Sequence, residues 1–207
     1  MMQYFTTVLL FFIVFSASAQ KTITPTDKNW IDITHLDKTI VTDIRYATTN
    51  NFTGSKIYDC GKCFLRSEVA KALAEAQKIF KQKGYGSIKV FDCYRPKLFQ
   101  QRLWAKKPNR NYVAPPQKGS MHNRGSAVDL TLLDTHGKEI DMGTPFDTFS
   151  EKAYYNYKNL PKNILTHRQI LRQVLEQVGF IGIRTEWWHF SYKLKQYELS
   201  EILWDCK

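Results

Sequence analysis

Apolar side chains recur at helical spacing in two segments of the chain. In the first segment Ser67 is the expected N-cap and Gly84 the expected end, and a second helix is expected from about 168 to 178, behind a capping box of Thr166 and Gln169. Because residues three and four apart share one face of a helix, both segments predict amphipathic helices. Their apolar stripes are Val69, Ala72, Leu73, Ala76, Ile79 and Phe80, and Ile170, Leu171, Val174, Leu175 and Val178.

Alternation of apolar and polar residues predicts strands elsewhere in the chain. The clearest are 87–94, 127–132 and 187–192. Two shorter pieces, 30–33 and 40–46, lie in an irregular N-terminal segment that extends to about residue 53. We expect this segment to form an arm that wraps onto the core.

The connections between these elements complete the expected fold. Pro96 should stand in the first turn of a third helix that carries Leu98, Leu103 and Trp104, and 106–119 should be a loop because it contains three prolines and no periodicity. Helices and strands follow one another without a regular βαβ rhythm. The pattern therefore predicts an α+β domain with a small, mainly antiparallel sheet flanked by helices.

Two of the expected strands carry polar side chains opposite their apolar residues. In 127–132, Asp129 and Thr131 alternate with three apolar residues that should face the core. In 187–192, His189 and Ser191 alternate with aromatic residues in the same way. Both strands should therefore present a polar face to a site.

Those strands belong to two short motifs that together supply two imidazoles and two carboxylates. His122, Asp129 and His189 suit a catalytic zinc site, in which three protein ligands leave a fourth position open. Glu186, three residues before His189, suits the proton acceptor for an attacking water molecule, and Trp187 and Trp188 should supply apolar walls that desolvate it and raise its basicity. The two motifs together predict one zinc ion per chain.

A single histidine near an acid is more often a bystander than a metal ligand. His35, His136 and His167 are assigned to that class, because none of them lies in such a motif. Two clusters that each contain a histidine and an acid arise by chance much less often than a single histidine near an acid. This pairing favours a zinc hydrolase over an ordinary polar surface.

The first 19 residues resemble a secretory signal peptide. The apolar core from Val8 to Phe15 is too short to span a bilayer, and a small-x-small pattern, Ala17 to Ala19, precedes Gln20. No Lys or Arg precedes the apolar core, which is atypical of such signals. We expect residues 1–19 to be removed, leaving one exported domain, 20–207, periplasmic or secreted and without stable membrane insertion.

The chain of 207 residues has a formal net charge of +11. Its lysines stand singly or in pairs, with no basic stripe interleaved with aromatic residues, so no nucleic-acid partner is expected. An exported basic protein could instead contact anionic polymers of the cell envelope. A solvated surface without a partner explains most of these lysines equally well.

Four cysteines, an even number in a chain expected to be exported, favour disulfides. Cys60, Cys63, Cys93 and Cys206 allow three pairings, and the sequence does not choose among them. Cys60 and Cys63 alone have the spacing of a redox pair or of half a structural zinc site, but no second pair at matching spacing follows. Structural bridges are the expectation.

Several motifs closely resemble those of the VanX-type D-alanyl-D-alanine dipeptidases. This zinc D,D-peptidase superfamily also contains the VanY-type carboxypeptidases and the zinc domain of hedgehog proteins. The resemblance covers most of the chain beyond residue 19. The matching motifs are Ser120-x-His122-x-x-Gly125-x-Ala127-x-Asp129, Glu186-x-Trp188-His189, Asp92-x-Tyr94-Arg95-Pro96, Tyr46-Ala-Thr-x-x-Asn-Phe-Thr-Gly54 and Met142-Gly-x-x-Phe-Asp147.

The resemblance implies a hedgehog/D,D-peptidase-like fold and a role for each matching position. Zinc would bind to the three ligands named above, with Glu186 as general base and then proton donor to the departing amine. Arg95 would stabilise the oxyanion, for which its fixed charge and forked donors are suited. Ser120 would bind the substrate carboxylate and Asp147 the free ammonium of the dipeptide. For Asp147 the residues alone allow an ordinary loop or N-cap aspartate equally well.

The expected export departs from the resistance-associated members of this family, which act in the cytoplasm. We therefore expect hydrolysis of D-Ala-D-Ala to D-alanine during turnover of cell-wall peptides rather than drug resistance. Two alternatives stay open at this point. One is a D,D-carboxypeptidase that acts on longer wall peptides, and the other is a wall-binding zinc module without catalysis.

Overall fold

The computed structural model describes residues 22–24, 27–110 and 112–206. The predicted signal peptide, 1–19, lies outside the described residues. Among the described residues no helix combines the length and the apolar character needed to cross a membrane.

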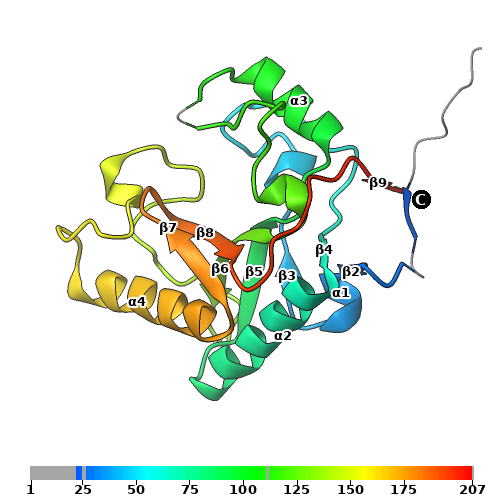
Figure 1. Ribbon diagram of the computed structural model, residues 1–207. Coiled ribbons are helices and arrows are strands. Elements are labelled where there is room, and N and C mark those ends of the chain that lie inside the picture. The colour runs from blue at the N-terminus through cyan, green and yellow to red at the C-terminus, as the bar shows by residue number, and fades with distance from the viewer. Residues whose placement is uncertain (1–21, 25–26, 111, 207) are drawn as a thin grey trace, which may run out of the picture.

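A five-stranded sheet forms the centre of the molecule, in the order β3-β5-β6-β8-β7 (Figure 1). Its strands are β3 (Val41–Thr42), β5 (Ser87–Asp92), β6 (Ala127–Leu133), β8 (Glu186–Tyr192) and β7 (Phe180–Ile183). Only β3 and β5 pair in parallel, and the other three pairs are antiparallel. The predicted α+β class with a small, mainly antiparallel sheet is confirmed.

Two long helices lie side by side against the sheet, and a shorter one lies beyond its opposite end (Figure 1). They are α2 (Ser67–Gln82), α4 (Lys162–Gln177) and α3 (Lys97–Lys106). Val128, Leu130 and Leu132 of β6 are fully buried, as their alternation predicted. The opposite face of β6 is buried as well, since every residue of the strand is shielded from solvent. The polar face of β6 is thus shielded from bulk solvent, and its Asp129 lines a cavity inside the molecule, as a polar face turned to a site requires.

The predicted starts of the helices were less accurate than the helices themselves. Ser67 is the first residue of α2 rather than its N-cap, and its hydroxyl donates to the carbonyl of Lys28. The capping box is also wrong, because α4 begins earlier and the Thr166 hydroxyl donates to the Lys162 carbonyl within the helix. Pro96 caps α3 rather than standing in its first turn. None of these three helices begins with a hydrogen bond from a side-chain cap.

The N-terminal segment forms an arm of short elements around the sheet. β1 (Thr22–Ile23) pairs in parallel with β9 (Leu203–Trp204), so the two ends of the described chain lie together. β2 (Trp30–Asp32) pairs antiparallel with β4 (Phe64–Arg66), and α1 (Ile33–Leu36) follows β2 directly. The arm therefore supplies one strand to each of two small sheets beside the main one.

Three 3₁₀ turns interrupt the loops: η1 (Arg45–Ala47), η2 (His122–Arg124) and η3 (Glu151–Ala153). η1 replaces the end of the strand expected at 40–46, which is reduced to β3. η2 closes on Gly125, whose φ of 70° is left-handed. A Cβ atom at Gly125 would lie 2.3 Å from the indole of Trp30, so only glycine fits there.

Two disulfides join the cysteines in one of the three possible pairings. Cys60 bonds to Cys206 and Cys63 to Cys93, and the described chain has no free cysteine. Neither cysteine of the Cys60-to-Cys63 turn bonds to the other, so the redox-pair and zinc-site interpretations are excluded. Structural bridging is the outcome.

Candidate metal centre

Strand register brings two of the predicted ligands together. β6 and β8 pair so that Asp129 lies directly opposite His189, and directly opposite residues of antiparallel strands project from the same face. His122 reaches them from η2, which turns the chain back toward β6. All three residues are buried.

Three ligand atoms converge at this point. His122 Nε2 lies 3.2 Å from His189 Nδ1 and 3.4 Å from Asp129 Oδ1. The distance between His189 Nδ1 and Asp129 Oδ1 is 2.9 Å. Ligands held at about 2.1 Å around a tetrahedral zinc ion are separated by roughly 3.3 Å. The donor set therefore has the spacing of three corners of such a site.

The partners of the outer ring nitrogens support the same interpretation. His122 Nδ1 lies 2.7 Å from the Cys93 carbonyl, which can only accept, so this nitrogen carries the proton and Nε2 presents a lone pair. His189 Nε2 lies 3.0 Å from the Ser191 hydroxyl, which can fix its ring in the same manner. Two lone pairs then face one another beside a carboxylate. A cation between them removes that repulsion, and such outer hydrogen bonds are typical of metal-bound histidines.

Among the described residues this triad is the one group of His, Cys, Asp or Glu side chains able to hold a metal ion. The other histidines lie elsewhere, as expected. His167, for example, is half-buried on α4, and its Nδ1 atom lies 2.9 Å from the Asp141 carbonyl.

Glu186 stands beside the triad at the start of β8. Its Oε2 lies 3.9 Å from His189 Nδ1 and its side chain is mostly buried. Burial raises the pKa of Glu186 above its usual value, and the charge of Asp129 adds to this effect while His189 opposes it. A carboxylate with a raised pKa is a stronger base, as proton transfer from water requires. Trp188 lines the same cavity, whereas Trp187 donates to Thr144 outside it.

Arg95 follows the end of β5 and is held by three acceptors. Its guanidinium donates to Asp92 Oδ2 at 2.5 Å, to the Tyr58 hydroxyl at 3.0 Å and to Gln100 Oε1 at 3.0 Å. Burial alone would lower the pKa of Arg95, but Tyr58 and the Asp92 carboxylate raise it well above its usual value. The side chain is therefore a fixed, oriented positive charge.

A cavity of about 500 Å³ contains the triad, Glu186 and Arg95. Ser120 lines it from the loop before η2 and is half-buried. Both its backbone N–H and its hydroxyl donate to Asn123 Oδ1, while the amide of Asn123 donates to the Arg95 carbonyl. Ser120 is thereby tied to the same frame as Arg95.

Asp147 lines the same cavity from the loop between β6 and α4. Its carboxylate accepts a hydrogen bond from the Tyr46 hydroxyl at 2.9 Å. Its φ of 58° is the one left-handed value at a non-glycine residue in the described chain, and it begins no helix. Such backbone strain tends to persist at functional sites.

Burial raises the pKa of Asp147 well above its usual value, and the nearby charge of Asp129 adds to this effect while the Tyr46 hydrogen bond opposes it. A cationic group that reached Asp147 would relieve this cost. The N-cap interpretation of Asp147 is wrong, and the residue is placed where a ligand ammonium could reach it.

Several supporting residues escaped the sequence interpretation. Asp92, Tyr58, Gln100 and Asn123 hold Arg95 or Ser120 in place, and the carbonyl of Cys93 orients His122. Asp92 alone offered a signal, because it lies three residues before Arg95 at a strand end. The others contact the site only through tertiary structure.

Known proteins resemble this chain over most of its length. A model of the D-ala-D-ala dipeptidase family (Peptidase_M15) matches residues 27–201. The chain is 35% identical over 161 residues to a D-alanyl-D-alanine dipeptidase of Escherichia coli (strain K12), a match that covers 78% of this chain and 83% of that protein. A protein of the same name from Enterococcus faecium is 34% identical over 76% of this chain and 88% of its own length.

A solved structure also resembles the chain, more distantly. It is a vancomycin resistance D,D-pentapeptidase, a VanY mutant in complex with Zn(II), with a TM-score of 0.41 and 18% sequence identity over 63% of this chain and 73% of that one. The family match and the identity to the curated relatives stand without it. This chain therefore belongs to the D-ala-D-ala dipeptidase family.

Proposed function

We propose that this protein is a zinc-dependent D-alanyl-D-alanine dipeptidase that acts in the cell envelope. One observation carries the proposal: the donor atoms of His122, Asp129 and His189 converge in a buried cavity that Glu186 and Arg95 also line. Relatives named for this activity match most of the chain.

The residues divide the hydrolysis of a peptide bond among them. His122, Asp129 and His189 would hold zinc, which when bound polarises the peptide carbonyl and makes water acidic enough to attack at neutral pH. Glu186 takes the proton of the attacking water and passes it to the departing amine. Arg95 stabilises the negative charge that develops on the carbonyl oxygen, because its guanidinium is already oriented and cannot lose its charge.

Recognition of the two ends of a dipeptide falls to loop residues. Ser120 binds the substrate carboxylate and Asp147 the free ammonium. Next to Asp147, Phe149 stacks on Tyr112 with ring centroids 4.2 Å apart, and both rings line the cavity. This aromatic wall favours a short substrate. Asp147 favours one with a free N-terminus, since an acylated substrate would leave its carboxylate without an ammonium partner.

A substrate comparison tests the proposed activity. Purified protein should release D-alanine from D-Ala-D-Ala, should not act on L-Ala-L-Ala or N-acetyl-D-Ala-D-Ala, and should lose activity with a chelator and regain it with zinc. Turnover of acylated or pentapeptide substrates without turnover of the dipeptide would make the protein a D,D-carboxypeptidase. Binding of these peptides without hydrolysis in zinc-replete buffer would make it a silent wall-binding module.

The location in the cell envelope rests on residues 1–19 and on the two disulfides, which persist in oxidising compartments. There the enzyme would recover D-alanine from peptides released by wall turnover. Fractionation of producing cells, with N-terminal sequencing of the protein, tests this part. A cytoplasmic protein that keeps residues 1–19 would contradict it.

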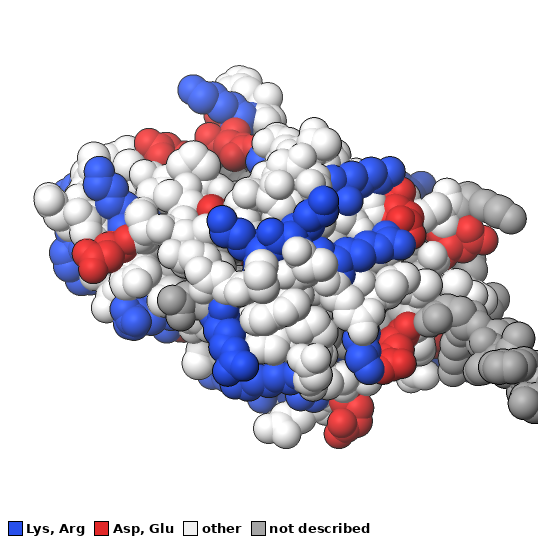
Figure 2. Space-filling model, turned by 90° about the horizontal axis from the view of Figure 1, so that it is seen from above, with Lys and Arg blue, Asp and Glu red and all other residues white. Residues whose placement is uncertain are grey.

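The proposal includes contact with anionic envelope polymers through the face around the cavity. No acidic residue occurs between Asp92 and Asp129 in the sequence, and Figure 2 shows Lys and Arg gathered on the face that carries α3 and the loop after it. The exposed cations of this segment with no acidic partner in the described chain are Lys106, Lys107, Arg110 and Lys118. The test is co-sedimentation of the protein with isolated cell walls. The bound fraction should fall in Lys106→Glu/Lys107→Glu, and it should fall for the wild type at high salt. The control variant Lys71→Glu/Lys83→Glu, with one change on α2 and one just after it, should bind as the wild type does.

A further inference from the structure

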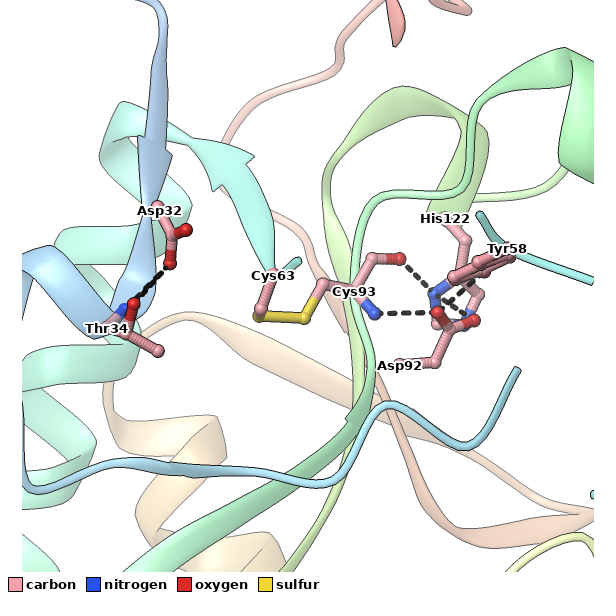
Figure 3. Close-up of a disulfide and its surroundings, with 7 residues drawn as sticks. All are labelled: Asp32, Thr34, Tyr58, Cys63, Asp92, Cys93 and His122. Atoms are coloured by element: carbon pink, nitrogen blue, oxygen red, sulfur yellow. Dashed lines mark hydrogen bonds and ion pairs between the residues drawn. A yellow bond between two sulfur atoms is a disulfide. The ribbon is translucent and has the colours of Figure 1, made fainter. Parts of the chain in front are cut away.

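The buried disulfide between Cys63 and Cys93 lies directly behind the metal centre. Both cysteines are 1% exposed, and Cys93 comes immediately after Asp92, the last residue of β5 (Figure 3). We propose that this bridge is a positioning element of the site: it holds the Cys93 backbone where His122 can bind metal and where Arg95 can meet the substrate. The inference rests on the proposed zinc site and adds a requirement to it.

Both backbone groups of Cys93, its carbonyl and its N–H, make hydrogen bonds that orient site residues. Its carbonyl accepts the Nδ1 hydrogen of His122 at 2.7 Å, which sets the ring so that Nε2 faces Asp129 and His189. Its N–H donates to Asp92 Oδ1 at 2.9 Å, on the same carboxylate that holds Arg95 (Figure 3). A displacement of the Cys93 backbone would therefore disturb the ring of His122 and the carboxylate that holds Arg95 at once.

The bridge fixes that backbone against a second layer of the molecule. Cys63 directly precedes β4, and its own carbonyl accepts from the Ile33 N–H of the arm. One residue further on in each segment, the Tyr94 N–H donates to the Phe64 carbonyl. The disulfide and this hydrogen bond therefore join the end of β5 to the β2–β4 sheet, at the point where the chain leaves the main ladder.

The second bridge provides an internal comparison. Cys60 is partly exposed and Cys206 exposed, and in the described part of the chain neither contributes a hydrogen bond to a site residue. It joins residues 146 apart, against 30 for the buried bridge. In the chain-entropy model the longer loop gives the larger stabilisation. We therefore expect the Cys60–Cys206 disulfide to contribute more to the stability of the whole fold, and the Cys63–Cys93 disulfide to contribute more to the geometry of the site.

Formation of the buried bridge makes the site depend on redox surroundings during folding. The thiols of Cys63 and Cys93 together lose two protons and two electrons to form the bond, and the disulfide of an oxidised thiol compound or protein takes them up to become two thiols. Once the protein is folded, burial shields the bond from reductants. The bridge then acts as an assembly requirement, so that the chain reaches full zinc affinity only where disulfides form.

Two double variants test the proposal: Cys63→Ala/Cys93→Ala and, as the matched control, Cys60→Ala/Cys206→Ala. The readouts are zinc affinity by chelator competition without substrate, kcat and KM for D-Ala-D-Ala, and thermal unfolding of the metal-free protein. We expect the first variant to lose about 10- to 100-fold in zinc affinity, as for loss of an orienting contact behind a metal ligand. Its kcat should fall with little change in KM, whereas the control should lose thermal stability but keep zinc affinity and kcat.

Unchanged zinc affinity in Cys63→Ala/Cys93→Ala, or an equal loss in both variants, would overturn the proposal. If the alanine pair does not fold, as judged by circular dichroism well below the transition of the wild type, Cys63→Val/Cys93→Ala restores packing volume and is measured in its place. A wild-type protein that binds zinc tightly but does not cleave D-Ala-D-Ala would refute the proposed function and leave this inference intact.

Discussion

The two halves of the active-site cavity are built in different ways. At the metal half, His122, Asp129 and His189 are at most 9% exposed, and β6 and β8 set the positions of two of them. At the half for which we propose substrate recognition, called the recognition half below, Ser120 and Asp147 are half-buried and lie on loops. One half is fixed by a sheet and the other by side-chain contacts to distant segments.

The difference in construction suggests that the metal half determines catalysis and the recognition half determines substrate preference. A sheet ladder holds its residues cooperatively, so the ligand geometry persists unless the sheet opens. Loop residues can be changed one at a time without disturbing the strands. We therefore expect substitutions at the metal half to abolish turnover and those at the recognition half to shift KM or substrate preference.

Loss of a ligand should have the largest effect. In His189→Ala, zinc content should fall from one per chain to near zero and turnover to background, because two ligands do not hold the ion against dilution. Metal analysis after gel filtration, with a dipeptide assay, measures both. His167→Ala, at a half-buried histidine of α4 that does not line the cavity, is the control and should retain both. Zinc retained at the wild-type level would remove His189 from the ligand set.

Loss of the base should separate catalysis from metal binding. Glu186→Ala should keep zinc but lose about 10²- to 10⁴-fold in kcat, as is typical when a general acid–base is removed. Zinc content and kcat are measured on the same sample. Parallel loss of metal would show that Glu186 acts as a ligand rather than as a base.

Arg95→Lys keeps the charge but not the fork that contacts Asp92, Tyr58 and Gln100. We expect kcat to fall by about 10²- to 10³-fold with little change in KM, since the lost contact belongs to the transition state. Arg102→Lys, at an exposed ion pair with Asp59, serves as the control. A kcat equal to that of the wild type would exclude Arg95 from oxyanion stabilisation.

At the recognition half, Asp147→Asn should raise KM for the free dipeptide by about 10- to 100-fold, the loss of one charge-assisted hydrogen bond. The pKa of Asp147 is raised, and only the deprotonated carboxylate pairs with an ammonium group. The wild-type KM should therefore rise as the pH falls through this pKa, and that part of the pH profile should vanish in Asp147→Asn. A pH profile shared by both proteins would assign the titration to another group.

Ser120→Ala should have the smallest effect, an increase in KM of about 3- to 10-fold, because one neutral hydroxyl contact is lost and Asn123 still holds the backbone N–H. Ser150→Ala, on the surface before η3, is the comparison. Steady-state kinetics on D-Ala-D-Ala distinguishes the two. A fall in kcat instead of a rise in KM would place Ser120 at the reacting centre.

The same contrast explains what the sequence could predict. Alternation in β6 and β8 is a local pattern, and it suffices to assign Asp129 and His189 to the polar faces of their strands. Nothing local distinguishes Asp147 from an ordinary loop aspartate, and only the resemblance to a family singled it out. Its environment comes from Tyr46, about a hundred residues away in the chain.

The helix starts were predicted wrongly and the disulfide pairing could not be predicted, for a related reason. The capping box at Thr166 is a sound local signal, yet Pro161 starts α4 earlier in the chain and the threonine turns inward to the helix backbone. Four cysteines allow three pairings, and which one forms depends on which segments meet in space. The bridge behind the metal centre could therefore be expected as a bond but not as a part of the site.

The contact between Gly125 and Trp30 joins two segments that lie far apart in the sequence. The glycine closes the turn that carries His122, and the indole of the arm fills the place of its missing side chain. A larger residue at position 125 would meet two obstacles: its φ of 70° is one that side chains rarely adopt, and its Cβ atom would overlap the indole. A smaller residue at position 30 would remove only the second obstacle, so position 125 should stay glycine among homologues even where position 30 varies.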